Sequence, residues 1–390
     1  MRHVATRMSR IAPFHVMDIL ARARRLESAG RSIIHMEIGE PDFPTAPQIV
    51  QAGIAALQQG HTHYTSALGL PELRSAIAAS YAAAARPEAD RVAVTPGASG
   101  ALQLIFGVLI NPGDEVLMAD PGYPCNRHFV RLFEGVARLI PVDATTGYQL
   151  SAELVRQYWT PRTRAVLIAS PSNPTGTLVA TSEMAEIVRV VADLGGCVIV
   201  DEIYLGLTYG DAAVSALNHS PDVFIVNSFS KYYGMTGWRL GWLVAPLEYV
   251  PEIDRLAQNI FLAPSTPAQH AALAAFTPEV EVELQRRRGV FRERRDFLLP
   301  ALRALGFMIP LTPQGAFYLY ADASRFTDDS QAFCLELLEQ TGVAITPGLD
   351  FGEYRPQRHV RISYANTLER LQEGVRRMAQ FLPTRRSWSS

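Results

Sequence analysis

The sequence predicts an α/β fold, with a large domain whose mostly parallel sheet is sandwiched by helices and a smaller α+β domain. Between residues 91 and 226, short apolar runs alternate with helical segments, which is typical of a mostly parallel sheet covered on both faces. After Arg239 the pattern changes, and a long charged helix leads into a second group of short strands. Two different patterns in one chain therefore indicate two domains.

Size and composition are those of an ordinary globular protein. The 390 residues suffice for one large and one small domain, and 48% of them are hydrophobic. A formal net charge of −2 argues against nucleic acid or an anionic membrane as a partner. No apolar run approaches membrane-spanning length, and residues 1–10 lack the apolar core of a signal peptide. We therefore expect a cytoplasmic protein that binds neither nucleic acid nor membrane.

Cysteines and histidines do not indicate a metal site. Cys125, Cys197 and Cys334 are scattered and form no Cys-x-x-Cys pair, which suits a reducing compartment. His61 and His63 are spaced by one residue, but no third ligand follows nearby. We expect the segment around these histidines to be a polar loop.

The domain limits follow from the order of the predicted elements. We expect residues 1–45 to form an N-terminal segment that belongs to the small domain, 46–283 to form the large domain, and 284–390 to form the small C-terminal domain. Helices are predicted at 14–30 and 45–59. The predicted strands of the large domain are 92–94, 115–118, 138–142, 165–169, 197–200, 223–226 and 240–244.

The second half of the chain is predicted to be more helical. Two helical stretches follow residue 244, and a long helix at 281–305 bridges into the small domain. The small domain is expected to contain strands at 316–320, 343–346 and 359–363 and helices at 330–340 and 368–381, with a frayed tail at 384–390.

Polar residues and glycines follow the predicted strands at the points where those strands end. In open parallel sheets, ligands bind beyond the carboxyl ends of the strands. The residues that fall there are Gly97 to Ser99, Tyr123, Asn173, Asp201 and Lys231. The sequence therefore predicts a ligand site at this edge of the sheet.

Lys231 is the only lysine among the 36 basic residues of the chain. A primary amine can form a Schiff base with an aldehyde, which a guanidinium cannot usefully do. Ser228, Ser230 and Arg239 surround it in a glycine-rich segment that suits a phosphate. Residues 97–99 join a strand to a helix, where free N–H groups and the helix dipole favour an anion. A strand-to-helix turn by itself more often binds no ligand. Together with the two serines and Arg239, however, this turn indicates a site for a single phosphate.

The segment from Ser228 to Gly241 resembles the signature of the class I/II aminotransferases, which are pyridoxal-phosphate enzymes of fold type I. The family pattern is Ser-x-Ser-Lys followed by x-Gly-x-Arg-x-Gly. The resemblance implies that Lys231 carries the cofactor and that Arg239 holds its phosphate. It also places the phosphate beside Gly97, Ala98, Ser99, Ser228 and Ser230.

The same resemblance assigns the residues around the cofactor ring. Asp201 would pair with the protonated pyridine nitrogen, so that the ring can accept electrons from a carbanion. Tyr204 and Asn173 would bond the ring's phenolic oxygen, and the ring of Tyr123 would stack on the pyridine. Tyr64 matches a tyrosine that reaches the phosphate of the neighbouring subunit, so the resemblance implies a homodimer.

Substrate contacts are implied in the same way. Arg361 lies in a predicted strand and matches the arginine that grips the α-carboxylate as a bidentate fork. Gly39 matches a backbone contact to the same carboxylate, and Asn173 lies beside it. We expect Phe14 to help shape the pocket.

The sequence thus indicates an aminotransferase that moves the amino group of an L-amino acid to a 2-oxo acid such as pyruvate or 2-oxoglutarate. Relatives specific for dicarboxylates often carry a lysine on the helix after Ser99, and this chain has none. We therefore favour a neutral or aromatic donor, although Arg127 offers a cation for an acidic side chain.

Two other functions stay open at this point. A lyase of the same fold that cleaves a C–S bond at Cβ would use the same Lys231 and Asp201. A non-catalytic regulator would need an N-terminal helix-turn-helix domain, for which the resemblance leaves no room.

Overall fold

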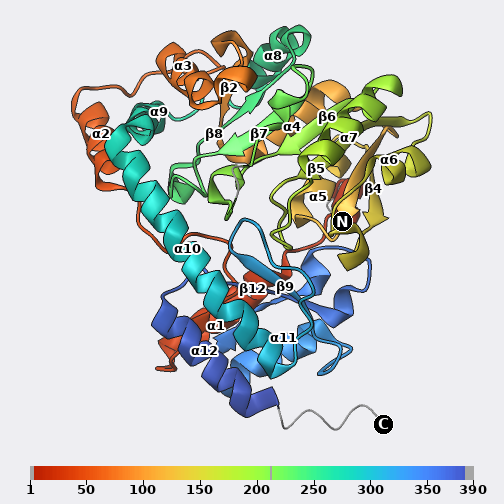
Figure 1. Ribbon diagram of the computed structural model, residues 1–390. Helices are drawn as coiled ribbons and strands as arrows, with labels where there is room; N and C mark the ends of the chain where they lie inside the picture. The colour runs from red at the N-terminus through yellow and green to blue at the C-terminus, as the bar shows by residue number, and fades with distance from the viewer. Residues whose placement is uncertain (1–3, 211–212, 383–390) are drawn as a thin grey trace.

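The computed structural model describes residues 4–210 and 213–382, and the tail expected at 384–390 lies outside these residues. Figure 1 shows two bodies, one around a large sheet and one around a small sheet, joined by the long helix α10 (Pro278–Leu305). The predicted α/β architecture is confirmed.

The large sheet has seven strands in the order β2-β8-β7-β6-β5-β3-β4. All neighbouring pairs are parallel except those made by β8, which runs antiparallel to β2 and to β7. The strands are β2 (Val92–Thr95), β3 (Glu115–Asp120), β4 (Val136–Pro141), β5 (Thr163–Ala169), β6 (Cys197–Asp201), β7 (Phe224–Ser228) and β8 (Gly241–Val244).

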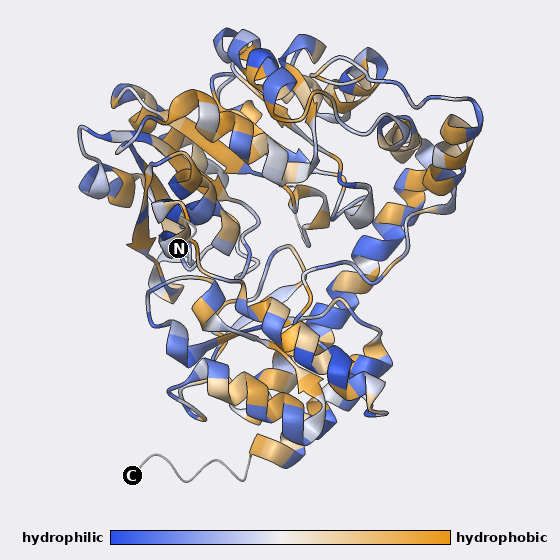
Figure 2. Cartoon of the chain, turned by 180° about the vertical axis from the view of Figure 1, so that it is seen from behind, coloured by the Kyte–Doolittle hydropathy of each residue, from blue (hydrophilic) through white to orange (hydrophobic). Residues whose placement is uncertain are grey.

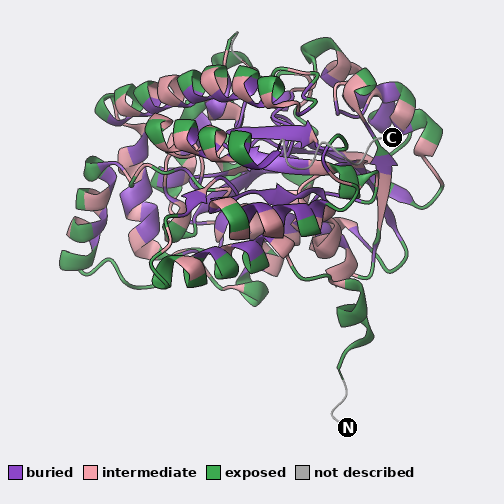
Figure 3. Ribbon diagram, turned by 90° about the horizontal axis from the view of Figure 1, so that it is seen from below, coloured by how far each residue is buried: buried purple, intermediate pink, exposed green. Residues whose placement is uncertain are grey.

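Helices cover both faces of this sheet. Successive residues of one strand point to opposite faces, so a strand that is apolar throughout needs helices on both. Val198 and Val200 of β6 pack into one apolar core and Ile199 packs into another. The buried strands lie between exposed helices in Figure 3, and they are the most apolar elements in Figure 2. The helices of this body are α2 (Pro47–Gln58), α3 (Pro71–Ser80), α4 (Gly97–Leu109), α5 (Pro124–Leu132), α6 (Ala152–Tyr158), α7 (Thr181–Asp193), α8 (Val250–Ile260) and α9 (Thr266–Leu273).

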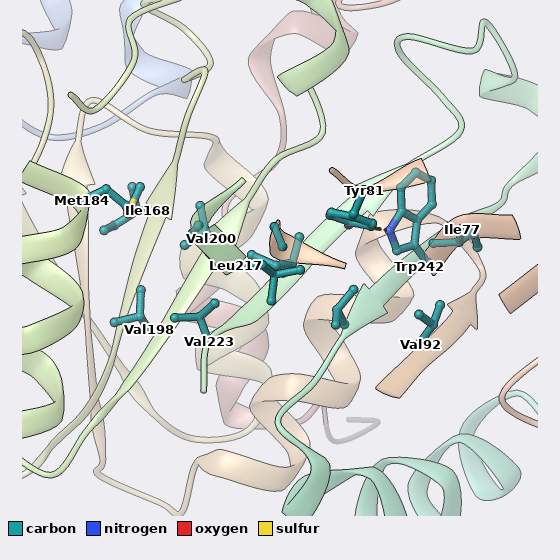
Figure 4. Packing of buried hydrophobic residues seen from close by; sticks show 14 of the residues in the cluster. Ile77, Tyr81, Val92, Ile168, Met184, Val198, Val200, Leu217, Val223 and Trp242 are labelled. Carbon is teal, nitrogen blue, oxygen red and sulfur yellow. Dashed lines mark hydrogen bonds between the residues drawn. The ribbon is translucent and has the colours of Figure 1, made fainter. Parts of the chain in front are cut away.

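One of the two cores contains a buried polar pair as well as aliphatic side chains. Figure 4 shows aliphatic residues of the central strands packed together with Tyr81 and Trp242. Trp242 Nε1 donates a hydrogen bond of 3.0 Å to the hydroxyl oxygen of Tyr81, so the indole N–H is satisfied away from water. The sheet is therefore a rigid support for the loops at its carboxyl edge.

The small body combines both ends of the chain. Its three-stranded sheet has the order β11-β12-β9, and a parallel pair joins β1 to β10. The elements are α1 (His15–Ser28), β1 (Ile34–His35), β9 (Tyr318–Asp322), α11 (Ser330–Thr341), β10 (Val343–Ala344), β11 (Thr346–Pro347), β12 (His359–Ser363) and α12 (Leu368–Phe381). Ile19 and Ile34 share a core with residues of α10, α11 and α12, so α1 and β1 belong with the C-terminal part of the chain. Arg10, which precedes α1, instead accepts a hydrogen bond from Arg131 of α5 in the large body.

Several predicted elements differ from the structure. The expected strand 316–320 begins two residues later, because Ala316 has a positive φ of 57° that β structure does not allow. The expected strand 343–346 is two short strands, β10 and β11. β10 pairs with β1 and β11 pairs with β12, and Ile345 lies between them. The strand expected at 138–142 is β4, which starts at Val136. Helices α3 and α6 were not predicted.

Candidate active site

A cavity of about 760 Å³ lies where the carboxyl edge of the large sheet faces the small body. Strands β5, β6 and β7 are parallel, so their carboxyl ends and the loops that follow meet at this edge. The predicted site residues that line the cavity are Gly39, Ala98, Ser99, Tyr123, Asn173, Asp201, Tyr204, Ser228, Ser230, Lys231, Arg239 and Arg361. Residues distant in sequence thus form one site.

One end of the cavity is built to hold an anion. Gly97 begins α4 with a φ of +73°, and a Cβ added to it would lie 2.6 Å from Nη2 of Arg239. Gly241 similarly has no room for a Cβ, which would lie 2.9 Å from the backbone nitrogen of Ala98. The two glycines therefore allow the guanidinium and the N-terminus of a 13-residue helix to approach each other closely.

Two serine hydroxyls complete this anion-binding end. Ser228 Oγ lies 2.9 Å from Ser230 Oγ and accepts a hydrogen bond of 3.0 Å from the backbone nitrogen of Ser230. Arg239 Nη1 donates to the carbonyl oxygen of Thr236 at 2.8 Å, which orients its guanidinium. Hydroxyls, N–H groups of a helix start and a guanidinium are the donors that a phosphate accepts.

The amine of Lys231 lies on the cavity wall. Its Nζ donates a hydrogen bond of 2.6 Å to the carbonyl oxygen of Gly39, on a segment that precedes the large domain in sequence. Burial lowers the pKa of Lys231 to about 8, and the positive charge of Arg361 acts in the same direction. A substantial fraction of this amine is therefore neutral near pH 8, which is the form that reacts with an aldehyde.

Asp201 ends β6 and is 6% exposed. Burial raises the pKa of its carboxyl to about 6, although one of its oxygens accepts a hydrogen bond of 3.1 Å from the backbone nitrogen of Ile203. A carboxylate in such surroundings gains most from a cationic partner. A protonated pyridine nitrogen is a partner of that kind.

Arg361 on β12 is 3% exposed and forms no ion pair with any described residue. Its Nη1 donates to Asn173 Oδ1 at 3.0 Å, and its Nη2 donates to the carbonyl oxygen of Glu37 at 2.6 Å. Its Nε is buried without a hydrogen-bond partner. A guanidinium buried with neutral acceptors alone leaves an unbalanced charge, so this place favours a bound carboxylate.

Aromatic side chains form the rest of the wall. Tyr123 meets Phe14 edge to face at 6.5 Å between ring centroids, and both line the cavity. The hydroxyl oxygen of Tyr204 lies 2.8 Å from that of Tyr318 on β9. Tyr318 was not predicted as a site residue, because a contact between a strand of one body and a loop of the other leaves no local pattern in the sequence.

These features fit pyridoxal phosphate. The cradle at Gly97 and Arg239 matches a phosphate, the amine of Lys231 an aldehyde, and the buried carboxyl of Asp201 a ring nitrogen. Arg239, Lys231 and Asp201 line one cavity, while Gly97 is not among its lining residues and contributes the start of α4. The structure therefore brings these predicted residues together, and their individual roles stay predictions.

Some expected residues lie elsewhere. Tyr64 is 81% exposed and does not line the cavity. Arg127 donates to the carbonyl oxygen of Asp350 at 3.0 Å and faces a separate, much smaller cavity. Arg127 is therefore not positioned to meet a substrate side chain in this cavity.

Other cavity residues were missed by sequence reasoning. Met17 and Leu20 of α1, together with Val16 and Ile38, give the wall an apolar surface. The helical pattern of α1 places its residues on faces, but the sequence does not show which face meets the cavity.

The described residues were also searched for other kinds of site. No group of three or more histidine, cysteine, aspartate or glutamate side chains in residues 4–210 and 213–382 is arranged to hold a metal ion. None of the helices in the same part of the chain has both the length and the apolar character that crossing a membrane requires.

Comparison with known proteins identifies the family. Residues 31–378 match the family described as aminotransferase class I and II. The chain belongs to the class I and II aminotransferases. Like its relatives, this aminotransferase moves an amino group between an amino acid and a 2-oxo acid, depends on pyridoxal phosphate and has the type I fold of such enzymes.

Three relatives cover nearly the whole aminotransferase. A valine–pyruvate aminotransferase of Mycobacterium tuberculosis is 40% identical over 379 residues, which are 96% of this chain and 97% of the relative. An aspartate aminotransferase of Geobacillus stearothermophilus is 35% identical over 398 residues, which are 98% and 99% of the two chains. A crystal structure of an aminotransferase from Mycobacterium tuberculosis is 39% identical, with a TM-score of 0.95 over 98% of this chain and 100% of that chain.

Proposed function

We propose that the amino donor is an L-amino acid with a neutral, apolar or aromatic side chain. We propose that the acceptor is a small 2-oxo acid, and of the two acceptors expected from the sequence we favour pyruvate over the dicarboxylate 2-oxoglutarate. The observation that carries this proposal is the lining of the cavity, which combines an apolar wall with a lack of spare positive charge. We call Arg361 the carboxylate clamp, because we assign it to the α-carboxylate of the substrate. The side chain of the donor must contact the part of the cavity wall that neither the cofactor nor this clamp occupies.

The cations that line the cavity all have another task. Among the described residues, these are Lys231, Arg239 and Arg361, which we assign to the aldehyde, the phosphate and the substrate α-carboxylate. Glu40 also lines the cavity and accepts a hydrogen bond from the hydroxyl of Thr236. A second carboxylate on the substrate would meet no free cation among the described residues that line the cavity, and it would be repelled by Glu40.

The apolar wall offers a surface for a hydrocarbon side chain. Phe14, Val16, Met17 and Leu20 come from one helix and the residue before it, and Ile38 follows from the next segment. Burying the side chain of valine or phenylalanine against such a surface contributes roughly 1–3 kcal/mol, whereas a carboxylate would lose its hydration there.

The names of the relatives support both kinds of donor. One relative is named for valine and pyruvate and another for aspartate. The lining of this cavity favours the first kind, and the single methyl group of pyruvate suits the apolar wall better than a second carboxylate does.

We assign the chemistry to the residues as follows. Bound pyridoxal phosphate supplies an aldehyde for the substrate amine and a ring that accepts electrons from Cα. Lys231 holds the cofactor and, once its amine is released, moves the proton at substrate Cα. Asp201 keeps the ring nitrogen protonated, and Tyr204 and Asn173 donate hydrogen bonds to the ring oxygen. Arg361, assisted by the backbone of Gly39, orients the substrate carboxylate.

We further propose a cytoplasmic homodimer in which Tyr64 reaches the phosphate of the neighbouring subunit. Its 81% exposure and its distance from the cavity of its own chain support a role in another copy. Three free thiols suit a reducing compartment. We propose the domain limits 1–45, 46–283 and 284–390 given above, with the first and last parts in one small domain, which the core shared by Ile34 and α10 supports.

A panel of donors and acceptors tests the substrate proposal. With pyruvate as acceptor, we expect kcat/KM for valine or phenylalanine to exceed that for aspartate by at least about tenfold, which corresponds to about 1.4 kcal/mol. The 2-oxo acid product of each donor is measured directly. The Lys231→Ala variant should be folded, should form no borohydride-trapped adduct and should show no turnover.

Two results would contradict the proposal. Aspartate as the best donor would mean that the partner subunit or a rearranged side chain supplies a cation. Release of pyruvate and ammonia from a β-substituted donor without any acceptor would instead identify a β-lyase.

A further inference from the structure

Tyr318 links the three-stranded sheet of the small body to the segment that follows β6 of the large sheet, inside the active-site cavity. It is the first residue of β9 in the small sheet, it is 0% exposed, and its hydroxyl oxygen lies 2.8 Å from that of Tyr204. Tyr204 follows β6 of the large sheet. The two rings meet at 84° with centroids 5.8 Å apart, so their orientation is set by packing as well as by the hydrogen bond.

The ring of Tyr318 also contacts the carboxylate clamp. The guanidinium carbon of Arg361 lies 4.3 Å from the centroid of the Tyr318 ring. Arg361 pairs across the strands with Tyr320, which is two residues along β9 from Tyr318. A cation over an aromatic ring draws electron density from it and makes the phenol a stronger hydrogen-bond donor.

A third contact places the Tyr318 hydroxyl beside Gly39. A Cβ added to Gly39 would lie 2.7 Å from that hydroxyl oxygen, so only glycine fits there. The carbonyl oxygen of Gly39 in turn accepts the hydrogen bond from Lys231. The hydroxyl of Tyr318 is therefore in contact with Tyr204 and lies beside Gly39, which accepts the hydrogen bond of the amine, while the ring of Tyr318 contacts Arg361.

We propose that Tyr318 is a positioning residue that donates its hydroxyl proton to Tyr204 and so directs the Tyr204 proton toward the cofactor's ring oxygen. The inference rests on the role of Tyr204 proposed above. A phenol has one proton to donate. If Tyr204 gives its proton to the ring oxygen, it must accept from Tyr318, and accepting a hydrogen bond strengthens the one it donates.

The test uses the pH midpoint of the visible absorption change of the cofactor-loaded protein. A ring oxygen that receives weaker hydrogen bonds attracts a neighbouring proton more strongly, so the midpoint should rise when donation weakens. We expect Tyr318→Phe to raise the midpoint by about 0.5–1 pH unit, the equivalent of one hydrogen bond. The ring volume is unchanged, and thermal unfolding of the cofactor-free protein checks that the variant is folded.

Tyr364→Phe is a matched control. Tyr364 is a fully buried tyrosine of the same body that does not line the cavity, and its hydroxyl donates to the carbonyl oxygen of Ala316 at 3.2 Å. Removing this hydroxyl should lower stability as much as Tyr318→Phe does, without moving the midpoint. An equal shift in the control variant would mean that general loosening, and not Tyr318, causes the effect.

A double-mutant cycle with Tyr204→Phe separates the possible failures. We expect Tyr318→Phe to cause no further shift once Tyr204 is phenylalanine. If Tyr204→Phe moves the midpoint and Tyr318→Phe does not, the positioning role is wrong. If the two shifts add, Tyr318 acts directly on the cofactor and the inference is also wrong. If Tyr204→Phe itself moves nothing, the assigned role of Tyr204 fails first.

Discussion

Two side chains of the cavity are shifted toward their neutral forms. Burial lowers the pKa of Lys231 to about 8 and raises the pKa of Asp201 to about 6. Each shift means that the folded protein is less stable with that group charged. Such shifts are frequent at functional sites, where stability is lost for the sake of chemistry.

Asp201→Asn should therefore change how stability depends on pH. The folded state binds the carboxyl proton more tightly than the unfolded state, whose pKa is about 4. The cost of the charge is absent below about pH 4, grows as pH rises to about 6 and is complete at pH 7. At pH 7 we expect the cofactor-free variant to be more stable by about 1–3 kcal/mol, as measured by urea unfolding between pH 4 and 7.

Asp18→Asn serves as the control for this measurement, because Asp18 is exposed in the first turn of α1. It should leave the pH dependence as in the wild type. Burial also raises the pKa of Glu202 to about 7, so this carboxyl too lowers the stability as pH rises. It does so in the wild type and in both variants. An Asp201→Asn variant with the wild-type slope between pH 4 and 6 would show that this carboxyl is not shifted.

At the scale of elements, the apolar wall depends on the position of α1. This helix has no N-terminal cap from its own sequence. Asp350 supplies one instead, because its two carboxylate oxygens accept hydrogen bonds of 2.8 Å from the backbone nitrogens of His15 and Val16. The residue that caps α1 lies more than 300 positions away in sequence. It therefore holds α1, which carries the apolar wall, against the C-terminal part of the small body.

Asp350→Ala should loosen this wall. Loss of a helix cap costs about 1 kcal/mol, and we expect KM for an apolar donor to rise several-fold while kcat changes less. Asp329→Ala removes the cap of α11, where Asp329 accepts a hydrogen bond from the backbone nitrogen of Ala332. It should cost similar stability and leave KM unchanged. Equal KM values for the two variants would exclude a role of the α1 cap in substrate binding.

At the scale of the molecule, the cavity exists because two bodies meet. Helix α10 contributes Leu284 to the core of the large sheet and Leu298 to the core of the small body. Asp120 at the end of β3 accepts hydrogen bonds from the backbone nitrogens of Glu353 and Tyr354 in the small body. The distance between the phosphate cradle and the carboxylate clamp is therefore set by the packing of the bodies.

The proposed dimer makes a prediction of its own. Sedimentation should give a mass of twice the 42.9 kDa chain. Tyr64→Phe should weaken the binding of pyridoxal phosphate to the cofactor-free protein by about tenfold, the value of one lost hydrogen bond to a charged group, without changing the mass. His63→Ala, in the same exposed loop, should leave the affinity unchanged. A dimer in which Tyr64→Phe binds the cofactor normally would contradict the assigned contact.

Much of this protein is determined by local sequence. The apolar runs before Asp201 and before Ser228 form strands, as short apolar runs that end in turn residues usually do. The helix predicted at 368–381 has those bounds in the structure. Lys231 and Arg239 were predicted because the serines, glycines and charges that suggest a phosphate site all lie in one loop. Functional residues that lie close together in one segment can be predicted from the sequence of that segment.

The tertiary structure decided what depends on segments far apart in sequence. The bond between Tyr204 and Tyr318, the cap of α1 by Asp350 and the face of α1 that meets the cavity all depend on how the small body docks on the large sheet. The way the two bodies pack depends on many weak contacts between segments that are far apart in sequence. No local sequence pattern predicts the combined effect of these contacts. The family of the protein was therefore evident from its residues in order, whereas the shape of its substrate site required the folded chain.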